Sequence, residues 1–140
     1  MTVVLGYDES PGAQRALDSA IEVAAAFGDG LVIVYGAAPP NRLGEEYGAH
    51  HDALVAMGRE ALGRAVTAAQ EAGVPTRVEL VDALPVDALL QVADEVDARV
   101  IVVGTWAESP LKGAIIGSTP HKLLHLSSRP VLCVPAKTPQ

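Results

Sequence analysis

The sequence predicts an α/β protein of one domain, built on a doubly wound five-stranded parallel sheet with helices on both faces. Five short runs of strand character alternate with segments of helical periodicity along the 140 residues, and this alternation is typical of a parallel sheet. Four of the runs are nearly all apolar, as strands are when helices cover both faces of a sheet. Hydrophobic residues make up 49% of the chain, enough for one core, and the length is too short for two domains.

The predicted strands are residues 2–7, 31–35, 76–81, 99–103 and 130–134. The first helix follows the first strand, with Ser10 as its N-cap, Pro11 at its first position and Gly28 as its stop. Its apolar positions recur at helical spacing, and they are Ala13, Ala16, Leu17, Ala20, Ile21 and Ala24.

A second helix is predicted to start at about residue 51 and to end at Gly73, shortly before Pro75. One side of it is apolar and comprises Leu54, Met57, Ala61, Leu62, Ala65 and Ala69. The segment before it, residues 37–49, contains two prolines and two glycines and has no periodicity. We therefore expect a flexible loop there, which could serve as a lid.

Two shorter helices complete the pattern. The third spans residues 84–96 and accepts Pro85 in its first turn, where the missing N–H would be unpaired in any case. Its buried positions are predicted to be Val86, Leu89, Leu90 and Ala93. The fourth follows Ser118, a good N-cap, and continues through Leu126.

The two edges of the sheet differ in character. Residues 76–81 alternate between polar and apolar side chains, which indicates an edge strand. The last strand, at residues 131–134, is apolar on both faces. If it lies at the other edge, its unpaired backbone needs cover from a second chain. We therefore predict a homodimer through the strand at residues 130–134.

The composition narrows the class of protein. The net charge of −7 disfavours non-specific binding to nucleic acid or to acidic lipid. No uncharged run approaches the roughly 18 residues that a membrane-spanning helix needs. The first residues lack a basic segment followed by a long apolar one, so we expect a cytoplasmic protein. The single Cys133 lies in an apolar run and is expected to be a small buried hydrophobe rather than a reactive or paired thiol.

The most informative stretch runs from Gly104 to Thr119, because it leaves an apolar strand and ends where a helix can begin. The free amides and the dipole of a helix's first turn favour an anion, and glycines let the main chain approach a phosphate without a Cβ. This pattern predicts a site for a phosphate-bearing ligand. The alternative is that Gly104 and Gly117 only shape a loop. Neither a Walker A lysine sequence nor an intact G-x-G-x-x-G is present, so the motifs indicate neither a P-loop NTPase nor a standard dinucleotide fold.

Three segments together resemble the universal stress protein family, and the likeness covers essentially the whole chain. Gly6-Tyr-Asp-Glu-Ser10 runs into Ala16-Leu17, which is similar to the family's opening. Val102-Val-Gly104 follows the fourth strand in the same way, and Arg129-Pro-Val-Leu-Cys-Val134 is similar to the family's last strand. The resemblance implies the strand order 3-2-1-4-5, which puts the ends of the first and fourth strands side by side at a switch point where ligands collect.

The family's nucleotide signature is glycine, two residues, glycine, nine residues, and glycine followed by serine or threonine. Gly104, Ala107, Gly117 and Ser118 reproduce this spacing, with alanine in place of the second glycine. If position 107 requires a positive φ, alanine costs on the order of 1 kcal/mol, and its methyl group hinders the approach of a phosphate oxygen.

Three further departures bear on the ligand. Glu108 adds a negative charge, which Lys112 or a Mg²⁺ ion can offset. Gly36 stands where many members of the family have a branched apolar residue against adenine. Pro120 removes one amide from the first turn of the last helix.

In family members that bind ATP, adenine and ribose lie near the ends of the first two strands, and the triphosphate follows the signature. Carried over to this chain, the resemblance implies binding by Tyr7, Asp8, Gly36, Val103, Gly104, Ala107, Gly117, Ser118 and Thr119. The implied cofactor is ATP or another adenine nucleotide, with Asp8 as a candidate ligand of Mg²⁺. Asp8 has a simpler alternative role, which is to cap the turn that follows it.

Three other features have competing interpretations. His121 and His125 share a helix face at i, i+4 spacing, but without a third ligand or the glutamate of a zincin motif, a solvated face is favoured over a metal site. His50-His51 is likewise expected on the surface. Trp106 either stacks on a base or a partner at the mouth of a pocket, or plugs the loop.

Three functions stay open at the level of sequence. The first is a small stress-related dimer in which an adenine nucleotide orders the loop between Gly104 and Gly117 and so changes a surface that an unidentified protein partner recognises. The second is slow ATP hydrolysis, with Asp8 holding Mg²⁺ and Glu108 orienting water, although no nearby residue is a compelling base. The third is an interaction module that has lost nucleotide, with Ala107 as the sign of that loss.

Overall fold

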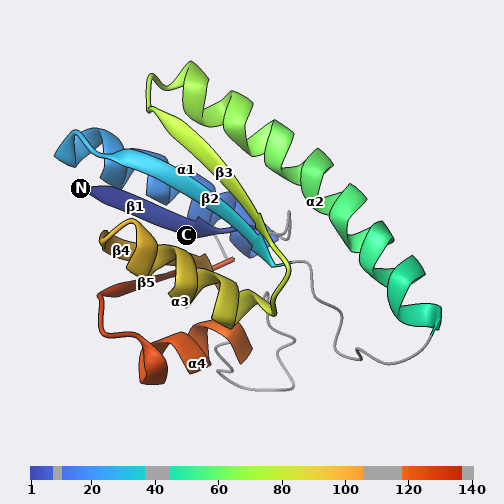
Figure 1. Cartoon of the computed structure of the whole chain (residues 1–140). Coiled ribbons are helices and arrows are strands. Elements are labelled where there is room, and N and C mark those ends of the chain that lie inside the picture. The colour runs from blue at the N-terminus through green and yellow to red at the C-terminus, as the bar shows by residue number, and fades with distance from the viewer. Residues whose placement is uncertain (8–10, 37–44, 106–117, 137–140) are drawn as a thin grey trace.

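The computed structural model describes residues 1–7, 11–36, 45–105 and 118–136. Strands and helices alternate along them (Figure 1). The elements are β1 (Thr2–Gly6), α1 (Pro11–Phe27), β2 (Gly30–Gly36), α2 (Glu45–Glu71), β3 (Thr76–Val81), α3 (Pro85–Glu95), β4 (Ala98–Gly104), α4 (Ser118–Leu126) and β5 (Val131–Val134). The strands form one parallel sheet in the order β3-β2-β1-β4-β5, which confirms the predicted fold class and strand order.

Different pairs of helices cover the two faces of the sheet. The helices α1 and α2 pack on one face, against Val3, Leu5 and Ile33. The helices α3 and α4 pack on the other face, against Val4 and Ile101. Successive residues of a strand point to opposite faces, so the central strand β1 contributes to both layers in turn. Val3, Val4 and Leu5 are all 0% exposed, which places the core directly on both sides of β1.

Most helix ends lie where the sequence predicts them. Gly28 and Gly73 follow α1 and α2 with φ of 68° and 77°, a left-handed conformation that glycine adopts without strain. The start of α2 is different, because the helix begins at Glu45 rather than at about residue 51. Residues 45–49, predicted as part of a flexible loop, are therefore helical, and residues 37–44 of that loop lie outside the described residues.

Arg129 fixes the start of β5. Its Nη1 donates to Asp97 Oδ1 at 2.8 Å and to the carbonyl oxygen of Ala98 at 3.1 Å. The hydrogen bond to Asp97 raises the pKa of Arg129 above its ordinary value. The strand then pairs with β4, so that β3 and β5 form the two edges of the sheet, as the sequence predicts.

At the amino end of the strands, a buried carboxylate pairs with an arginine. Asp29 is 5% exposed, and its Oδ2 accepts a hydrogen bond from Arg99 Nε at 2.5 Å. The Arg99 guanidinium also lies over the Phe27 ring, 4.2 Å from its centroid. The hydrogen bond from Arg99 lowers the pKa of Asp29 below its ordinary value, and this effect outweighs the opposing effect of burial. The pair ties the residue before β2 to the start of β4.

The lowered pKa makes stability depend on acidity. The charged form of Asp29 contributes stability that is present at neutral pH and is lost as the pH falls through the folded-state pKa. We expect Asp29→Asn to lower the urea midpoint near neutral pH, and the gap to the wild-type chain to narrow below about pH 4. Urea unfolding followed by circular dichroism over a pH series measures this gap. Asp18→Asn, which changes an exposed carboxylate on α1, is the control, and a gap that stays constant down to about pH 2 contradicts the linkage.

Candidate functional site

The predicted ligand site lies where β1 and β4 end side by side. The register pairs Leu5 of β1 with Val102 of β4, so Tyr7 and Gly104 lie at the same edge of the sheet. Past this edge the chain continues into α1 on one face and into α4 on the other. Such a divergence is the switch point at which open α/β sheets bind ligands.

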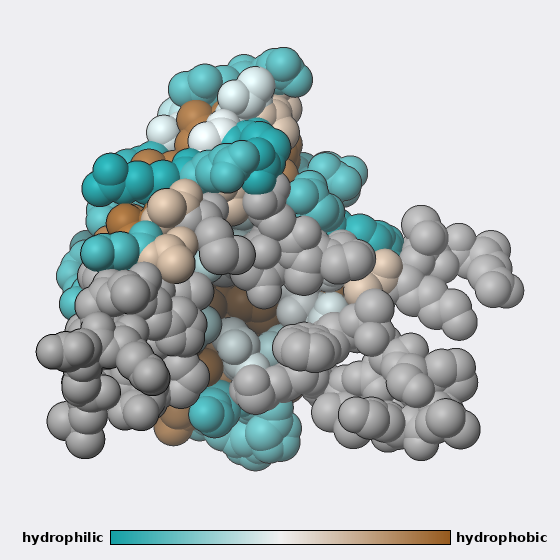
Figure 2. Space-filling model, turned by 90° about the vertical axis from the view of Figure 1, so that its right-hand side faces the viewer, coloured by the Kyte–Doolittle hydropathy of each residue, from teal (hydrophilic) through white to brown (hydrophobic). Residues whose placement is uncertain are grey.

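Part of the described surface at this side of the molecule is apolar. Figure 2 looks onto the side towards which the strands run, and apolar surface, drawn in brown, is visible near its centre. Apolar surface at the carboxyl ends of the strands suits a flat aromatic base.

The ring of Tyr7 is part of the core. The residue is 4% exposed and packs with α1, and Gln14 Nε2 donates to its hydroxyl oxygen at 2.7 Å. Its main-chain N–H donates to the carbonyl oxygen of Val34 at 3.1 Å. The side chain therefore supports the strand end rather than facing a ligand. Asp8, the next predicted site residue, lies outside the described residues.

Gly36 ends β2 against the connection from β3 to α3. A Cβ on Gly36 would lie 2.7 Å from the carbonyl oxygen of Ala83 and 2.9 Å from Pro85 Cα. These neighbours are main-chain atoms, which cannot rotate away as a side chain can. Packing thus explains why this chain has glycine where the resemblance leads one to expect a branched apolar residue.

Val103 and Gly104 end β4, where Val103 is buried and Gly104 is half-buried. Val103 is 3% exposed and belongs to the core on the α3 and α4 side. A Cβ on Gly104 would collide with the carbonyl group of Gly12 and lie 2.6 Å from the nitrogen of Ala13. The first glycine of the signature is therefore required by the close approach of α1, whether or not a ligand binds.

The first turn of α4 supplies the other half of the predicted phosphate site. The helix begins at Ser118, and because it follows β4 and leads back to a parallel strand, this turn lies at the carboxyl ends of the strands. Thr119 is half-buried, Pro120 is fully buried, and Leu123 belongs to the core. Amides in the first turn of a helix have no partner within the helix, so they can bind an anion.

Ala107 and Gly117 lie outside the described residues, as does Trp106, so the middle of the signature stays a prediction. The same holds for Asp8 as a ligand of Mg²⁺, and among the residues that the structure describes there is no group of three or more potential metal ligands.

His121, His125 and Cys133 lie in described elements. The two histidine side chains are exposed on α4, and their ring centroids are 4.8 Å apart. Cys133 is half-buried in β5, and burial raises the pKa of its thiol. A protonated thiol is a poor nucleophile, so this environment favours the packing role that the sequence predicts.

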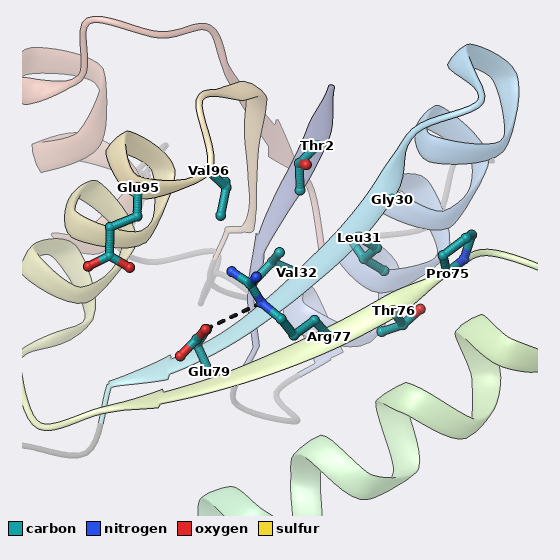
Figure 3. Close-up of a pocket in the computed structure, with 10 residues that line it drawn as sticks. All are labelled: Thr2, Gly30, Leu31, Val32, Pro75, Thr76, Arg77, Glu79, Glu95 and Val96. Carbon is teal, nitrogen blue, oxygen red and sulfur yellow. Dashed lines mark ion pairs between the residues drawn. The ribbon is translucent and has the colours of Figure 1, made fainter.

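A cavity of about 720 Å³ opens at the other end of the sheet (Figure 3). The first residues of β1, β2 and β3 line it, together with Glu95 and Val96 at the end of α3. Arg77 and Glu79 of β3 border it, with Arg77 Nε and Glu79 Oε1 3.3 Å apart. Because its walls lie at the amino ends of the strands, this cavity is separate from the predicted ligand site.

The sequence pattern does not single out Gly12, the second residue of α1. A Cβ on Gly12 would collide with the carbonyl oxygen of Thr105. The sequence gives one indication of its role, because glycine within a helix lowers stability by about 0.5–1 kcal/mol relative to alanine. A glycine in the first turn of an otherwise alanine-rich helix is therefore a sign that another segment of backbone comes close.

Comparison with known proteins agrees with the family resemblance and with the fold. The model of the universal stress protein family matches residues 1–135. A universal stress protein of Thermus aquaticus is 34% identical over 139 residues, which cover 95% of this chain and 97% of that protein.

Two related structures contain nucleotides. A universal stress protein in complex with cAMP is 33% identical, with a TM-score of 0.67 and coverage of 98% of both chains. The universal stress protein of Archaeoglobus fulgidus in complex with dAMP is 26% identical, with a TM-score of 0.74 and coverage of 96% of this chain and 97% of that one. In the described part of this chain, no helix combines the length and the apolar character needed to cross a membrane.

Proposed function

Since the chain belongs to the universal stress protein family, we propose that it binds an adenine nucleotide between the carboxyl ends of β1 and β4. The observation that carries this proposal is the switch point, where the chain continues from neighbouring strands into α1 and α4 on opposite faces. The amides in the first turn of α4 suit a phosphate, and the apolar surface at this end of the sheet suits a base. The related structures in complex with dAMP and cAMP support an adenine nucleotide as the ligand.

Most of the proposed contacts come from the main chain. Tyr7 and Val103 bury their side chains, and Gly36 and Gly104 have none. The base and ribose are proposed to lie near the ends of β1 and β2, and the phosphates along the signature from Gly104 to Thr119. With ATP as the ligand, the carboxylate of Asp8 is available to hold Mg²⁺, which prefers oxygen ligands.

The proposed output is binding rather than turnover. A bound nucleotide orders the signature segment in a cytoplasmic, stress-related homodimer and so changes a surface that another protein recognises. The dimer contact is proposed to lie on β5, whose outer edge has no partner strand among the described residues. Leu132 on this strand is 38% exposed, and an apolar edge strand is stabilised when a second chain covers it.

Equilibrium dialysis of the full chain against labelled ATP and Mg²⁺ tests nucleotide binding. We expect saturable binding that unlabelled AMP weakens by competition and that unlabelled GTP weakens less, because the base contributes to recognition. A dissociation constant of about 1 mM corresponds to a binding free energy near −4 kcal/mol. Absence of binding at about 1 mM ATP therefore contradicts the proposal and favours an interaction module without nucleotide.

Ala107→Gly restores the second glycine of the signature. If this position adopts a positive φ in the complex, the substitution removes a cost on the order of 1 kcal/mol and tightens ATP binding about fivefold. The same dialysis measures the change, with Ala72→Gly in the exposed turn after α2 as the control. An unchanged, measurable affinity shows that position 107 needs no glycine, and no binding by either chain shows that nucleotide binding is lost for another reason.

A further inference from the structure

Three elements meet at Thr105, the residue after β4. Its N–H donates to the carbonyl oxygen of Val134 in β5 at 2.9 Å. Its carbonyl oxygen lies against Gly12 of α1, in the space that a Cβ would occupy. Arg15, further along α1, donates from Nη1 to the carbonyl oxygen of Pro135 at 2.6 Å. The end of β4 is thus held between α1 and β5, and we call this contact the α1–β4–β5 junction.

The junction depends on two glycines that face each other. A Cβ on Gly104 would collide with the carbonyl group of Gly12, and a Cβ on Gly12 would collide with the carbonyl oxygen of Thr105. In both cases the added Cβ would lie well within 3.0 Å of a main-chain atom, a separation that Cβ atoms essentially never show. An added methyl group at either place must therefore move α1 or the end of β4, since protein interiors have little free volume to absorb it.

The described part of the chain stops at Thr105, just after β4, and resumes at Ser118, the first residue of α4. This second end is also fixed, because Pro120 and Leu123 are fully buried. Two residues of the proposed phosphate site, Gly104 and Thr119, lie at these two ends, so the distance between them depends on where each end is held. The junction determines the first of them.

We infer that Gly12 is a positioning residue of the nucleotide site, and this inference rests on the proposed function. By lacking a side chain, Gly12 sets the place of Gly104 and Thr105, at the first of these two ends. Gly12 does not touch the ligand and acts through the main chain of Thr105. A change at Gly12 therefore disturbs binding of the phosphates and leaves the base near the ends of β1 and β2 largely as it is.

Gly12→Ala tests this role through the ratio of two affinities. Dialysis at a temperature well below the unfolding midpoint gives the dissociation constants of ATP and of adenosine for the folded chain. We expect ATP to bind about tenfold more weakly, the effect of losing one hydrogen bond to a charged group, and adenosine to change less than about twofold. Gly63→Ala is the matched control, because nothing lies within 4 Å of a Cβ at that exposed helical position.

The ratio separates positioning from stability. A substitution with a structural effect alone lowers the unfolding midpoint but leaves the ratio of ATP to adenosine affinity unchanged in folded protein, and that result overturns the inference.

If Gly12→Ala does not fold by itself, the measurement is made in the Gly63→Ala background, where alanine in the helix adds stability. Gly104→Ala, which enters the same contact from the other side, is expected to reduce the same ratio. Failure of the wild-type chain to bind either ligand rejects the proposed function itself, whereas an unchanged ratio in a binding-competent chain rejects only the role of Gly12.

Discussion

Leu5→Ala is expected to lower the free energy of unfolding by about 3 kcal/mol, within the range for leucine in a closed core. Leu5 is 0% exposed and packs between the sheet and α1. The cavity left by its side chain cannot close easily, because β1 is paired with β2 on one side and β4 on the other. Domains of this kind are stable by about 5–15 kcal/mol, so the substitution removes a large part of the total.

Urea unfolding at neutral pH measures this effect. For a slope of about 2 kcal/mol per molar, the midpoint falls by roughly 1.5 M. Leu126→Ala makes the same chemical change on α4, where the side chain is 63% exposed, and we expect it to cost less than about 0.5 kcal/mol. Similar midpoints for the two variants mean that the core relaxes around position 5 or that β1 is not the centre of the cooperative unit.

The parallel sheet and its edge at β3 follow from patterns that a sequence shows directly, whereas the strand order is implied by the family resemblance. Apolar strands with helical segments between them predict a parallel sheet, and the alternating run at Thr76–Val81 is an edge strand in the structure. Glycines after α1 and α2 mark the helix ends because they adopt positive φ. These features are local, or depend on burial alone, and both leave a periodic signal in the residue order.

The start of α2 shows what periodicity misses. Residues 45–50 lack an apolar stripe and contain a glycine, which favours a loop, yet α2 begins at Glu45. Helix formation is cooperative, so a long helix extends beyond the part that its packed face specifies.

The candidate site shows a second limit, because close approaches of backbone are set by tertiary structure. Gly36 looks like a lost contact to adenine and Gly104 like a phosphate-lining residue, but each packs against a segment distant in sequence. Tyr7 is different, since the sequence does contain the relevant signal. Val3, Leu5 and Tyr7 alternate along the strand and share one core, so the period of two places the ring inside.

Leu132→Glu is expected to convert the proposed homodimer into a monomer. The strand β5 pairs with β4 along one edge, and its other edge has no partner among the described strands. Leu132 is 38% exposed there. In a two-fold dimer the same strand edge meets itself, so one substitution introduces two carboxylates into the contact. Their desolvation and mutual repulsion are expected to weaken association more than a hundredfold, a loss of about 3 kcal/mol.

Analytical ultracentrifugation separates the two states, because one chain has a mass of 14.5 kDa. Val78→Glu is the matched control, since it places the same charge on the opposite edge strand, at a valine that is 41% exposed. Dissociation by Leu132→Glu with an intact Val78→Glu dimer assigns the contact to β5, and the reverse pattern assigns it to β3. A wild-type chain that sediments as a monomer at about 100 µM contradicts the dimer altogether, because an interface of standard size holds copies together at that concentration.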